Sequence, residues 1–306
     1  MSILRVTLLG RFEATWDGAP LAGLEHAKAR ELFSYLLLNR DRPNSREIVA
    51  NHLWGGHYTT EVSKKYLRKA LWQLNESLAG CSDEIREELI CADSNWIQLK
   101  SIEPLWLDVA FVDNAYKVVK GIHGSQITLE TAKALSKVVR LCKGELLEGQ
   151  YHDWSFADGI RFRQVVLILL DKLIDHSVAH GQFESALEHG DLILRHDPAR
   201  ELTHLNLMRA YHALGDRTSA IRQYRRCCEA LREDLDVAPS RDVVELYNRM
   251  RMGEAAGITL VQGAISGAAR RGSNSLSGAG LDLISFDARL GADRQKNMTR
   301  LAAEVA

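Results

Sequence analysis

Two segments of this chain repeat at an interval of 34 residues, and this spacing restricts the possible folds more than any other feature. Gly181 is followed by Ala186, and Gly215 is followed at the same distance by Ala220. Glycine permits a tight turn, and alanine has no bulk to hold two packed helices apart. The spacing therefore predicts helical hairpins stacked side by side, an architecture that usually presents a surface to a partner.

The interval is the period of a tetratricopeptide (TPR) helix–turn–helix repeat. Helical patterns run from Asp108 to about Met252, with breaks at glycine-rich, Asp-Pro and proline positions. We expect an all-α, TPR-like helical domain over residues 104–252. Residues 253–306 contain a long Gly, Ala and Ser-rich stretch without an apolar period, so we expect a disordered C-terminal tail there.

Composition excludes several classes of protein. A length of 306 residues predicts about two domains, and the net charge of −1 gives no overall attraction to polyanions, although a local basic face is compatible with it. None of the five cysteines forms a Cys-x-x-Cys pair, which argues against a zinc site or a redox motif. No signal peptide opens the chain and no apolar run reaches about 18 residues, so we expect a cytoplasmic protein with no membrane association.

Residues 1–103 mix strand and helix patterns. Residues 3–9 and 12–16 alternate as strands do, and helical spacing follows over residues 26–39, 44–54 and 60–78. Asn44 with Glu47 three positions later resembles a capping box at the start of the second helix. Residues 89–92 and 96–100 predict a hairpin around a turn. This order predicts an N-terminal winged helix-turn-helix of α+β class in a chain that is otherwise mostly α.

The third predicted helix carries four cations within six positions. Lys64 and Arg68 share one row of the helix and Lys65 and Lys69 share another, which Gln73 continues. The remaining side offers an apolar seam that can pack on the first two helices. A basic helix face in a winged order is typical of a recognition helix in the major groove, where Arg and Gln can read base edges. A solvated charged surface is the alternative interpretation of the same pattern.

Cations outside this helix extend the predicted DNA-binding surface. Arg42 and Arg46, near the start of the second helix, are placed to contact phosphates or simply to solvate the surface. Asn95 at the hairpin tip and Lys100 further along are candidates for contacts to the minor groove or its phosphates. Trp96 is expected to pack the hairpin onto the third helix, because a lone aromatic residue in a strand is usually part of the core.

Several motifs in order then resemble one known family. The chain is similar to the SARP family (Streptomyces antibiotic regulatory proteins), which joins an OmpR-type winged helix to a bacterial transcriptional activator domain (BTAD). The N-terminal resemblance rests on Leu24–Leu36, Arg42–Glu47 and His52-Leu53-Trp54. The helical resemblance rests on Gly144–Gly149 with Trp154, on the two TPR-like turns, on Ser219–Tyr224 and on Leu231–Ser240.

This resemblance implies a transcriptional activator. Such proteins bind direct repeats in double-stranded promoter DNA, usually as homodimers, and recruit RNA polymerase. The resemblance also implies a polymerase-facing loop between the second and third helices, which here comprises Gly55, Gly56, His57, Tyr58 and Thr59. The helical domain would then dimerise and bind a protein or small-molecule effector.

The sequence bears on two other classes of function, an enzyme and a protein-interaction adaptor. The motifs Gly-x-Ser-x-Gly, His-Glu-x-x-His and a Gly-rich phosphate loop do not occur, so we expect no enzymatic activity, no catalytic residue and no cofactor. His176 and His180 are spaced to share a metal ion on a helix, but no third ligand stands near them, so no metal site is expected. A TPR-type protein-interaction adaptor, whose winged helix does not read DNA, is the stronger rival.

Overall fold

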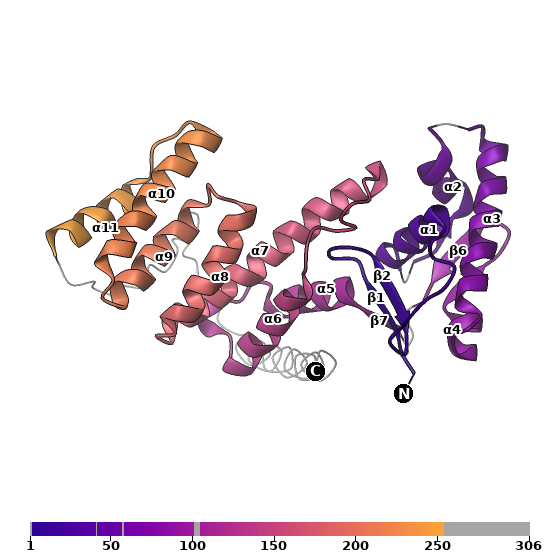
Figure 1. Cartoon of the computed structure of the whole chain (residues 1–306), viewed down its shortest axis with the longest axis horizontal. Coiled ribbons are helices and arrows are strands. Elements are labelled where there is room, and N and C mark those ends of the chain that lie inside the picture. The colour runs from indigo at the N-terminus through magenta and orange to yellow at the C-terminus, as the bar shows by residue number, and fades with distance from the viewer. Residues whose placement is uncertain (1, 41, 57, 101–104, 254–306) are drawn as a thin grey trace, which may run out of the picture. The chain divides into compact units, whose positions relative to one another are not determined.

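The computed structural model describes residues 2–40, 42–56, 58–100 and 105–253. The chain divides into two compact units (Figure 1). The N-terminal unit comprises residues 1–113 together with 140–165, and the helical unit comprises residues 114–139 together with 166–306. The predicted disordered tail lies outside the described residues except for Gly253, and the functional boundary expected at residue 103 stays a prediction.

The N-terminal unit begins with a four-stranded sheet in the order β3 (Ala19–Pro20), β2 (Glu13–Trp16), β1 (Leu4–Thr7) and β7 (Leu105–Leu107). β1 pairs antiparallel with β2 and parallel with β7, with Leu4 opposite both Trp16 and Leu105. Leu4 and Val6 are fully buried, as the alternation of apolar residues predicts. The sequence did not predict β3 or β7.

Three helices and a second sheet complete the winged arrangement. The helices are α1 (Ala27–Leu38), α2 (Arg46–Trp54) and α3 (Thr60–Leu78), followed by the short α4 (Asp83–Glu88). The second sheet has the order β4 (Asn44–Ser45), β6 (Trp96–Leu99) and β5 (Ile90–Ala92), so the predicted hairpin gains a third strand. The predicted strand–helix–hairpin order is therefore present, and α3 has the predicted bounds.

The capping box predicted from Asn44 and Glu47 is wrong. The N-cap of α2 is Ser45, and its side chain makes no capping hydrogen bond. Asn44 lies in β4 opposite Ile97, and its side-chain nitrogen donates to the carbonyls of Asn39 (3.2 Å) and Arg42 (3.0 Å). The amide is thus engaged in closing the preceding turn and cannot reach the helix start.

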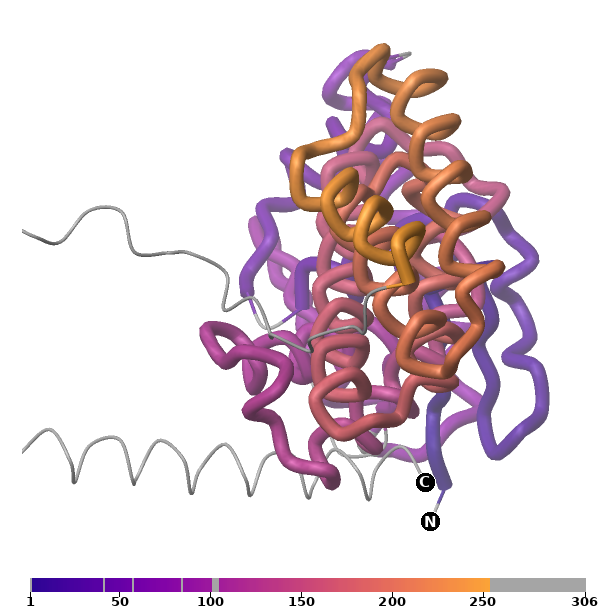
Figure 2. Tube along the Cα trace, turned by 90° about the vertical axis from the view of Figure 1, so that its left-hand side faces the viewer, coloured from indigo at the N-terminus to yellow at the C-terminus, as the bar shows by residue number. Residues whose placement is uncertain are grey.

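The rest of the described chain is helical: α5 (Asp108–Val119), η1 (Gly124–Gln126), α6 (Leu129–Leu141), η2 (Asp153–Ser155), α7 (Phe156–Ala179), α8 (Phe183–His196), α9 (Glu201–Ala213), α10 (Arg217–Leu235) and α11 (Arg241–Met252). Gly181 and Gly215 have φ angles of +69° and +79° at the predicted turns. Ala186 and Ala220, at the same place in each repeat, are fully buried. Helices α8 to α11 pack in succession (Figure 2), as stacked hairpins require.

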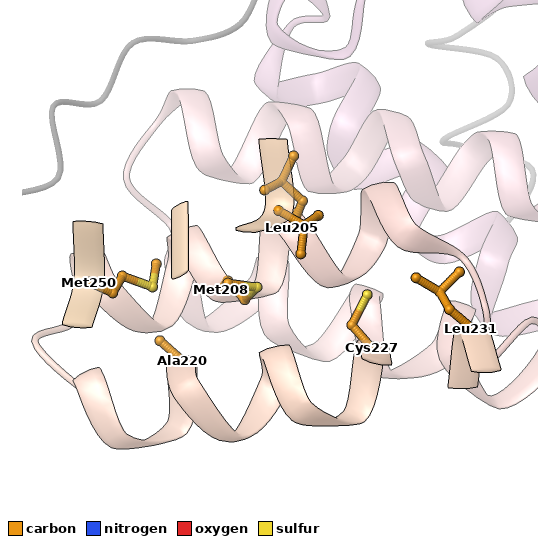
Figure 3. Packing of buried hydrophobic residues seen from close by; sticks show 7 residues of the cluster. Leu205, Met208, Ala220, Cys227, Leu231 and Met250 are labelled. Atoms are coloured by element: carbon orange, nitrogen blue, oxygen red, sulfur yellow. The ribbon is translucent and has the colours of Figure 1, made fainter. Parts of the chain in front are cut away.

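A sulfur-rich cluster joins the last three helices (Figure 3). Leu205 and Met208 of α9 meet Ala220, Cys227 and Leu231 of α10 and Met250 of α11. Beside this cluster, the rings of Tyr224 and Tyr247 stack with centroids 4.0 Å apart. Burial raises the pKa of Cys227 to about 12, so this thiol is a core group and not a reactive one.

Candidate nucleic-acid interface

Three of the predicted cations form an exposed face on α3. Lys65, Arg68 and Lys69 are exposed, whereas the seam from Leu67 to Leu74 is buried against the other helices. At about 100° per residue, the three cations project away from this seam. We call Lys65, Arg68 and Lys69 the basic face; it combines positive charge with accessibility on a firmly packed helix.

Lys64 and Gln73 lie at the flanks of the basic face. The Lys64 ammonium is 3.8 Å from Oε1 of Glu47 on α2, and the two side chains are 40% and 66% exposed. Exposed pairs of this kind contribute about 0–1 kcal/mol, so Glu47 does not prevent Lys64 from contacting a phosphate. Gln73 is half-buried, and its carbonyl accepts a hydrogen bond of 2.9 Å from the Ser77 hydroxyl.

Sequence reasoning missed Trp72, which stands within the basic face. Its side chain is 62% exposed. The signal was available in the helical period, because Trp72 stands seven residues after Lys65 and four after Arg68 and therefore shares their side of the helix. A large apolar side chain on a charged helix face is an informative departure from ordinary burial.

Arg46 connects α2 to the hairpin tip. Its backbone N–H donates to the carbonyl of Asn95 (2.8 Å), and its guanidinium donates to the carbonyl of Asp93 (3.0 Å). Backbone N–H groups of Asn95 and Trp96 donate to the Asp93 carboxylate and lower its pKa. Arg46 therefore positions the wing in addition to any phosphate contact. Arg42 is exposed and donates to the side chain of Asn39.

The hairpin separates the two remaining predicted contacts. Asn95 is exposed at the tip, whereas Lys100 follows the other end of β6 and donates its N–H to the carbonyl of Leu89 (2.9 Å). Trp96 is 48% exposed, so the expectation that it belongs to the core is wrong, and its packing onto the third helix stays a prediction. Strand alternation turns the neighbouring Ile97 inward and leaves Trp96 outside.

The loop predicted to face polymerase is described except for His57, which lies outside the described residues. Tyr58 is half exposed, and its ring packs edge-on against Tyr66 of α3 with centroids 4.9 Å apart. Gly56 and Thr59 are exposed, and Gly55 is half-buried at the end of α2. The loop is thus attached to α3 through an aromatic pair.

A buried carboxylate on α1 ties the winged elements to a distant part of the chain. Glu31 is 4% exposed and accepts hydrogen bonds from Lys28 (2.7 Å) and from the indole N–H of Trp154 (3.1 Å). Nδ1 of His152 lies 3.3 Å from the same carboxylate, and the His152 ring stacks on Trp154. Trp154, one of the residues that carry the family resemblance, thus anchors residues 152–154 against α1.

Residues 143–148 pair with the end of the first sheet. Gly10 donates to the carbonyl of Glu145 (2.7 Å), Leu147 donates to that of Leu8 (2.7 Å), and Leu9 bridges Leu146. The Gly144–Gly149 motif therefore acts as backbone partner of residues 8–10 within the N-terminal unit. These hydrogen bonds fasten residues 143–148 to the end of the first sheet.

Asp108, at the start of α5, is fully buried. Its carboxylate accepts backbone hydrogen bonds from Leu8 and Leu9 (both 2.8 Å) and from Val109 (2.7 Å). Burial raises the pKa of Asp108, and these backbone donors oppose that effect. Because the Asp108 carboxylate is buried and accepts these three backbone hydrogen bonds, its function is structural.

The two histidines considered for a metal lie together at the end of α7. Their ring centroids are 4.1 Å apart, and Nδ1 of His180 lies 2.8 Å from the carbonyl of His176. Within the described residues, no group of three or more His, Cys, Asp or Glu side chains is placed to hold a metal ion. Among the described helices, none has both the length and the apolar character needed to cross a membrane.

Comparison with known proteins assigns the helical part of the chain. Residues 107–251 match the bacterial transcriptional activator domain. A solved structure of Mycobacterium tuberculosis EmbR in complex with a low affinity phosphopeptide matches with a TM-score of 0.62 and 20% sequence identity. That match covers 83% of this chain but 66% of the EmbR chain, just under two thirds of it. No curated protein matches.

The family match supports a SARP-type transcriptional regulator, as the motifs predicted, and the structural match supports the fold. The BTAD segment begins at residue 107, so Asp108 stands at its start and the Gly144–Gly149 motif with Trp154 lies inside it. Part of the BTAD segment, residues 140–165, therefore packs within the N-terminal unit. The winged part in front of the BTAD carries the basic face.

Proposed function

We propose that this chain is a sequence-specific DNA-binding regulator of transcription that inserts α3 into the major groove of promoter DNA. The observation that carries the proposal is the basic face of α3, which lies opposite the buried seam of the same helix. The groove is about 12 Å wide and accepts a helix about 10–12 Å across with its side chains.

The side chains of the proposed interface make two kinds of contact, ionic contacts to phosphates and hydrogen bonds to bases. Lys64, Lys65 and Lys69 neutralise phosphates and release counterions, which supplies affinity that depends on salt. Arg68 and Gln73 are the proposed base readers, because their planar ends form paired hydrogen bonds with guanine and adenine. A second group of side chains contacts the DNA backbone or the minor groove. This group consists of Arg42, Arg46, Asn95 and Lys100.

We further propose activation through RNA polymerase, as the BTAD and the SARP-type resemblance imply. In this proposal two copies bind a direct repeat as a homodimer, and residues 55–59 face polymerase. The aromatic pair of Tyr58 and Tyr66 supports this role, since it connects the loop to the recognition helix. The helical domain receives a protein or small-molecule effector.

The test is a selection of duplex DNA from a random pool by the full chain, with the affinity of the winners measured at two salt concentrations. We expect enrichment of a direct repeat, with log K falling by about 0.9 per tenfold rise in salt for each phosphate neutralised. Arg68→Ala should weaken binding to the selected site by about 1–3 kcal/mol, and Lys69→Ala should reduce the salt slope by about one.

Arg11→Ala is the matched control, because Arg11 is an exposed cation of the connection between β1 and β2 and not of α3. This variant should keep the affinity of the unmodified chain. Unchanged affinity after charge reversal of Arg68 and Lys69 in a folded protein would contradict the proposal. Uniform weak binding, or none, would favour the protein-interaction adaptor instead.

A further inference from the structure

Trp72 has no structural purpose visible within the described residues. Its indole is 62% exposed, although it stands in a helix whose seam packs tightly. Within the described part of the chain, the ring takes part in no aromatic stacking or cation–π contact. An exposed Trp in this position gains stability only when a partner covers it.

The charges around Trp72 indicate which partner covers it. By helical rotation, Trp72 lies about 20° from Lys65, and it falls between Arg68 and Lys69 around the axis. The buried Leu71 and Leu67 project about 100° or more away from it. The exposed Glu76 follows Trp72 by one turn and the exposed Glu61 stands near the start of the helix, so the three cations flank the ring within the middle turns of α3. An apolar ring flanked by cations there matches a surface with negative edges and an apolar centre, which is the arrangement of phosphates around the base edges of a duplex.

Only one base offers an apolar group in the major groove. Thymine carries a C5-methyl group there, whereas the edges of the other bases present hydrogen-bonding atoms. Resting on the proposed function, we infer that Trp72 is a specificity-determining residue that contacts a thymine methyl group beside the base pair read by Arg68. The minor groove, about 6 Å wide, is too narrow for α3.

The inference is tested with the selected duplex and deoxyuridine. Replacing one thymine at a time by deoxyuridine removes the methyl group and leaves the base-pairing hydrogen bonds. At one position we expect about a fourfold loss of affinity for the full unmodified chain, the effect of one buried methyl-sized group. Trp72→Ala should bind the thymine duplex more weakly and should no longer distinguish thymine from deoxyuridine at that position.

Ile48→Ala is the matched control, because Ile48 is an exposed apolar side chain of α2 (53% exposed) outside the basic face. It should retain the deoxyuridine effect. Circular dichroism of each variant confirms that the fold persists, as expected for an exposed position. Trp72→Phe, which keeps an apolar ring, should retain part of the discrimination.

Two results would overturn the inference while leaving the proposed function intact. One is a selected site that responds to Arg68→Ala but to no deoxyuridine substitution. The other is a deoxyuridine effect that persists in Trp72→Ala. This result includes the case in which Trp72→Ala changes only the self-association of the protein. Failure of the chain to select any DNA would overturn the proposed function, and the inference with it.

Discussion

At the scale of the residue, Asp108 is the carboxylate on which the first sheet and the first BTAD helix meet. Asp108→Asn replaces an oxygen that accepts backbone N–H groups with an amide that donates. We expect a loss of about 1–3 kcal/mol in the free energy of unfolding, because buried donors lose their acceptor. Urea unfolding followed by tryptophan fluorescence measures this, since all six tryptophans lie in the N-terminal unit.

Asp17→Asn provides the comparison for Asp108. Asp17 is exposed and accepts one backbone hydrogen bond, 2.8 Å long, from Ile3. Its φ of +49° is a backbone conformation that asparagine also tolerates, so the change should stay within about 0.5 kcal/mol. Equal losses of unfolding free energy for the two substitutions would show that the buried carboxylate contributes no more to stability than the exposed one.

Single residues of the candidate site differ in how far the sequence predicts them. Lys65, Arg68 and Lys69 followed from helical spacing, because a 19-residue helix has one period throughout. The same period gives the position of Trp72 but not its exposure, which depends on what the neighbouring helices leave uncovered. Asp108 was recognised only as a helix start, since its acceptor role depends on Leu8 and Leu9 at the far end of the N-terminal unit's sequence.

At the scale of the element, two glycines give opposite predictions for the same substitution. A Cβ at Gly190 of α8 would lie 2.4 Å from Cδ2 of Leu207 on α9, so Gly190→Ala must either displace the buried Leu207 side chain or push the two helices apart. We expect a loss of about 1–3 kcal/mol in the free energy of unfolding, despite the better helix propensity of alanine. Thermal or urea unfolding followed by circular dichroism measures this loss.

Gly159→Ala in α7 is the control for helix propensity alone. A Cβ at Gly159 meets no atom within 4 Å, so this substitution should stabilise the protein by about 0.5–1 kcal/mol. A stabilising effect at both positions would mean that α8 and α9 are less closely packed than the contact of Gly190 with Leu207 requires.

The sequence predicts elements that depend on residues close together in the chain, but it does not predict elements that depend on pairing with residues far away in the chain. α3 and the turns at Gly181 and Gly215 depend on spacing within a few residues, and the structure has them where the sequence predicts them. β7 exists because Leu105 pairs with Leu4 about a hundred positions earlier, and three residues carry no strand signal of their own. The capping box failed for a different, local reason, since the side chain of Asn44 is held by the nearby carbonyls of Asn39 and Arg42.

At the scale of the whole molecule, the sequence predicts a winged helix-turn-helix followed by a helical domain. It does not predict which residues belong to each of the two compact units. Helical patterns recur from Asp108 to about Met252 with several breaks, and no break by itself assigns residues 140–165 to the N-terminal unit. The contacts responsible are the pairing of residues 143–148 with residues 8–10 and the hydrogen bond from Trp154 to Glu31. The BTAD family match, which spans residues 107–251, crosses the same division.

The helical unit should lose stability in mild acid because it buries His204. This side chain is 2% exposed, with Nε2 2.8 Å from the carbonyl of Pro198 and Nδ1 2.8 Å from the amide nitrogen of Gln223. A carbonyl only accepts, so Nε2 carries the proton and Nδ1 accepts from Gln223. Protonation would place a second N–H against the amide donor, and burial lowers the pKa of His204 below the ordinary 6.5.

The sign of the pH effect follows from proton binding. Below pH 6.5 the unfolded chain binds a proton at His204 that the folded chain does not, so this contribution to stability is complete above 6.5 and is lost as the pH falls. Burial of Asp171 and Asp175 raises the pKa of both groups and acts in the opposite direction, toward greater stability as they become protonated. Their contribution is common to the native chain and to a His204 variant, and it cancels in the difference between them.

His204→Gln therefore isolates the effect, since glutamine is polar but does not titrate. We expect the unfolding free energy of the native chain, measured in urea by circular dichroism, to fall more steeply from about pH 7 to about pH 5.5 than that of the variant. Tryptophan fluorescence reports the N-terminal unit in the same samples and separates a local loss from a general one. Parallel curves for the two proteins over this range would contradict the argument, because His204 would then bind its proton equally in the folded and unfolded chain.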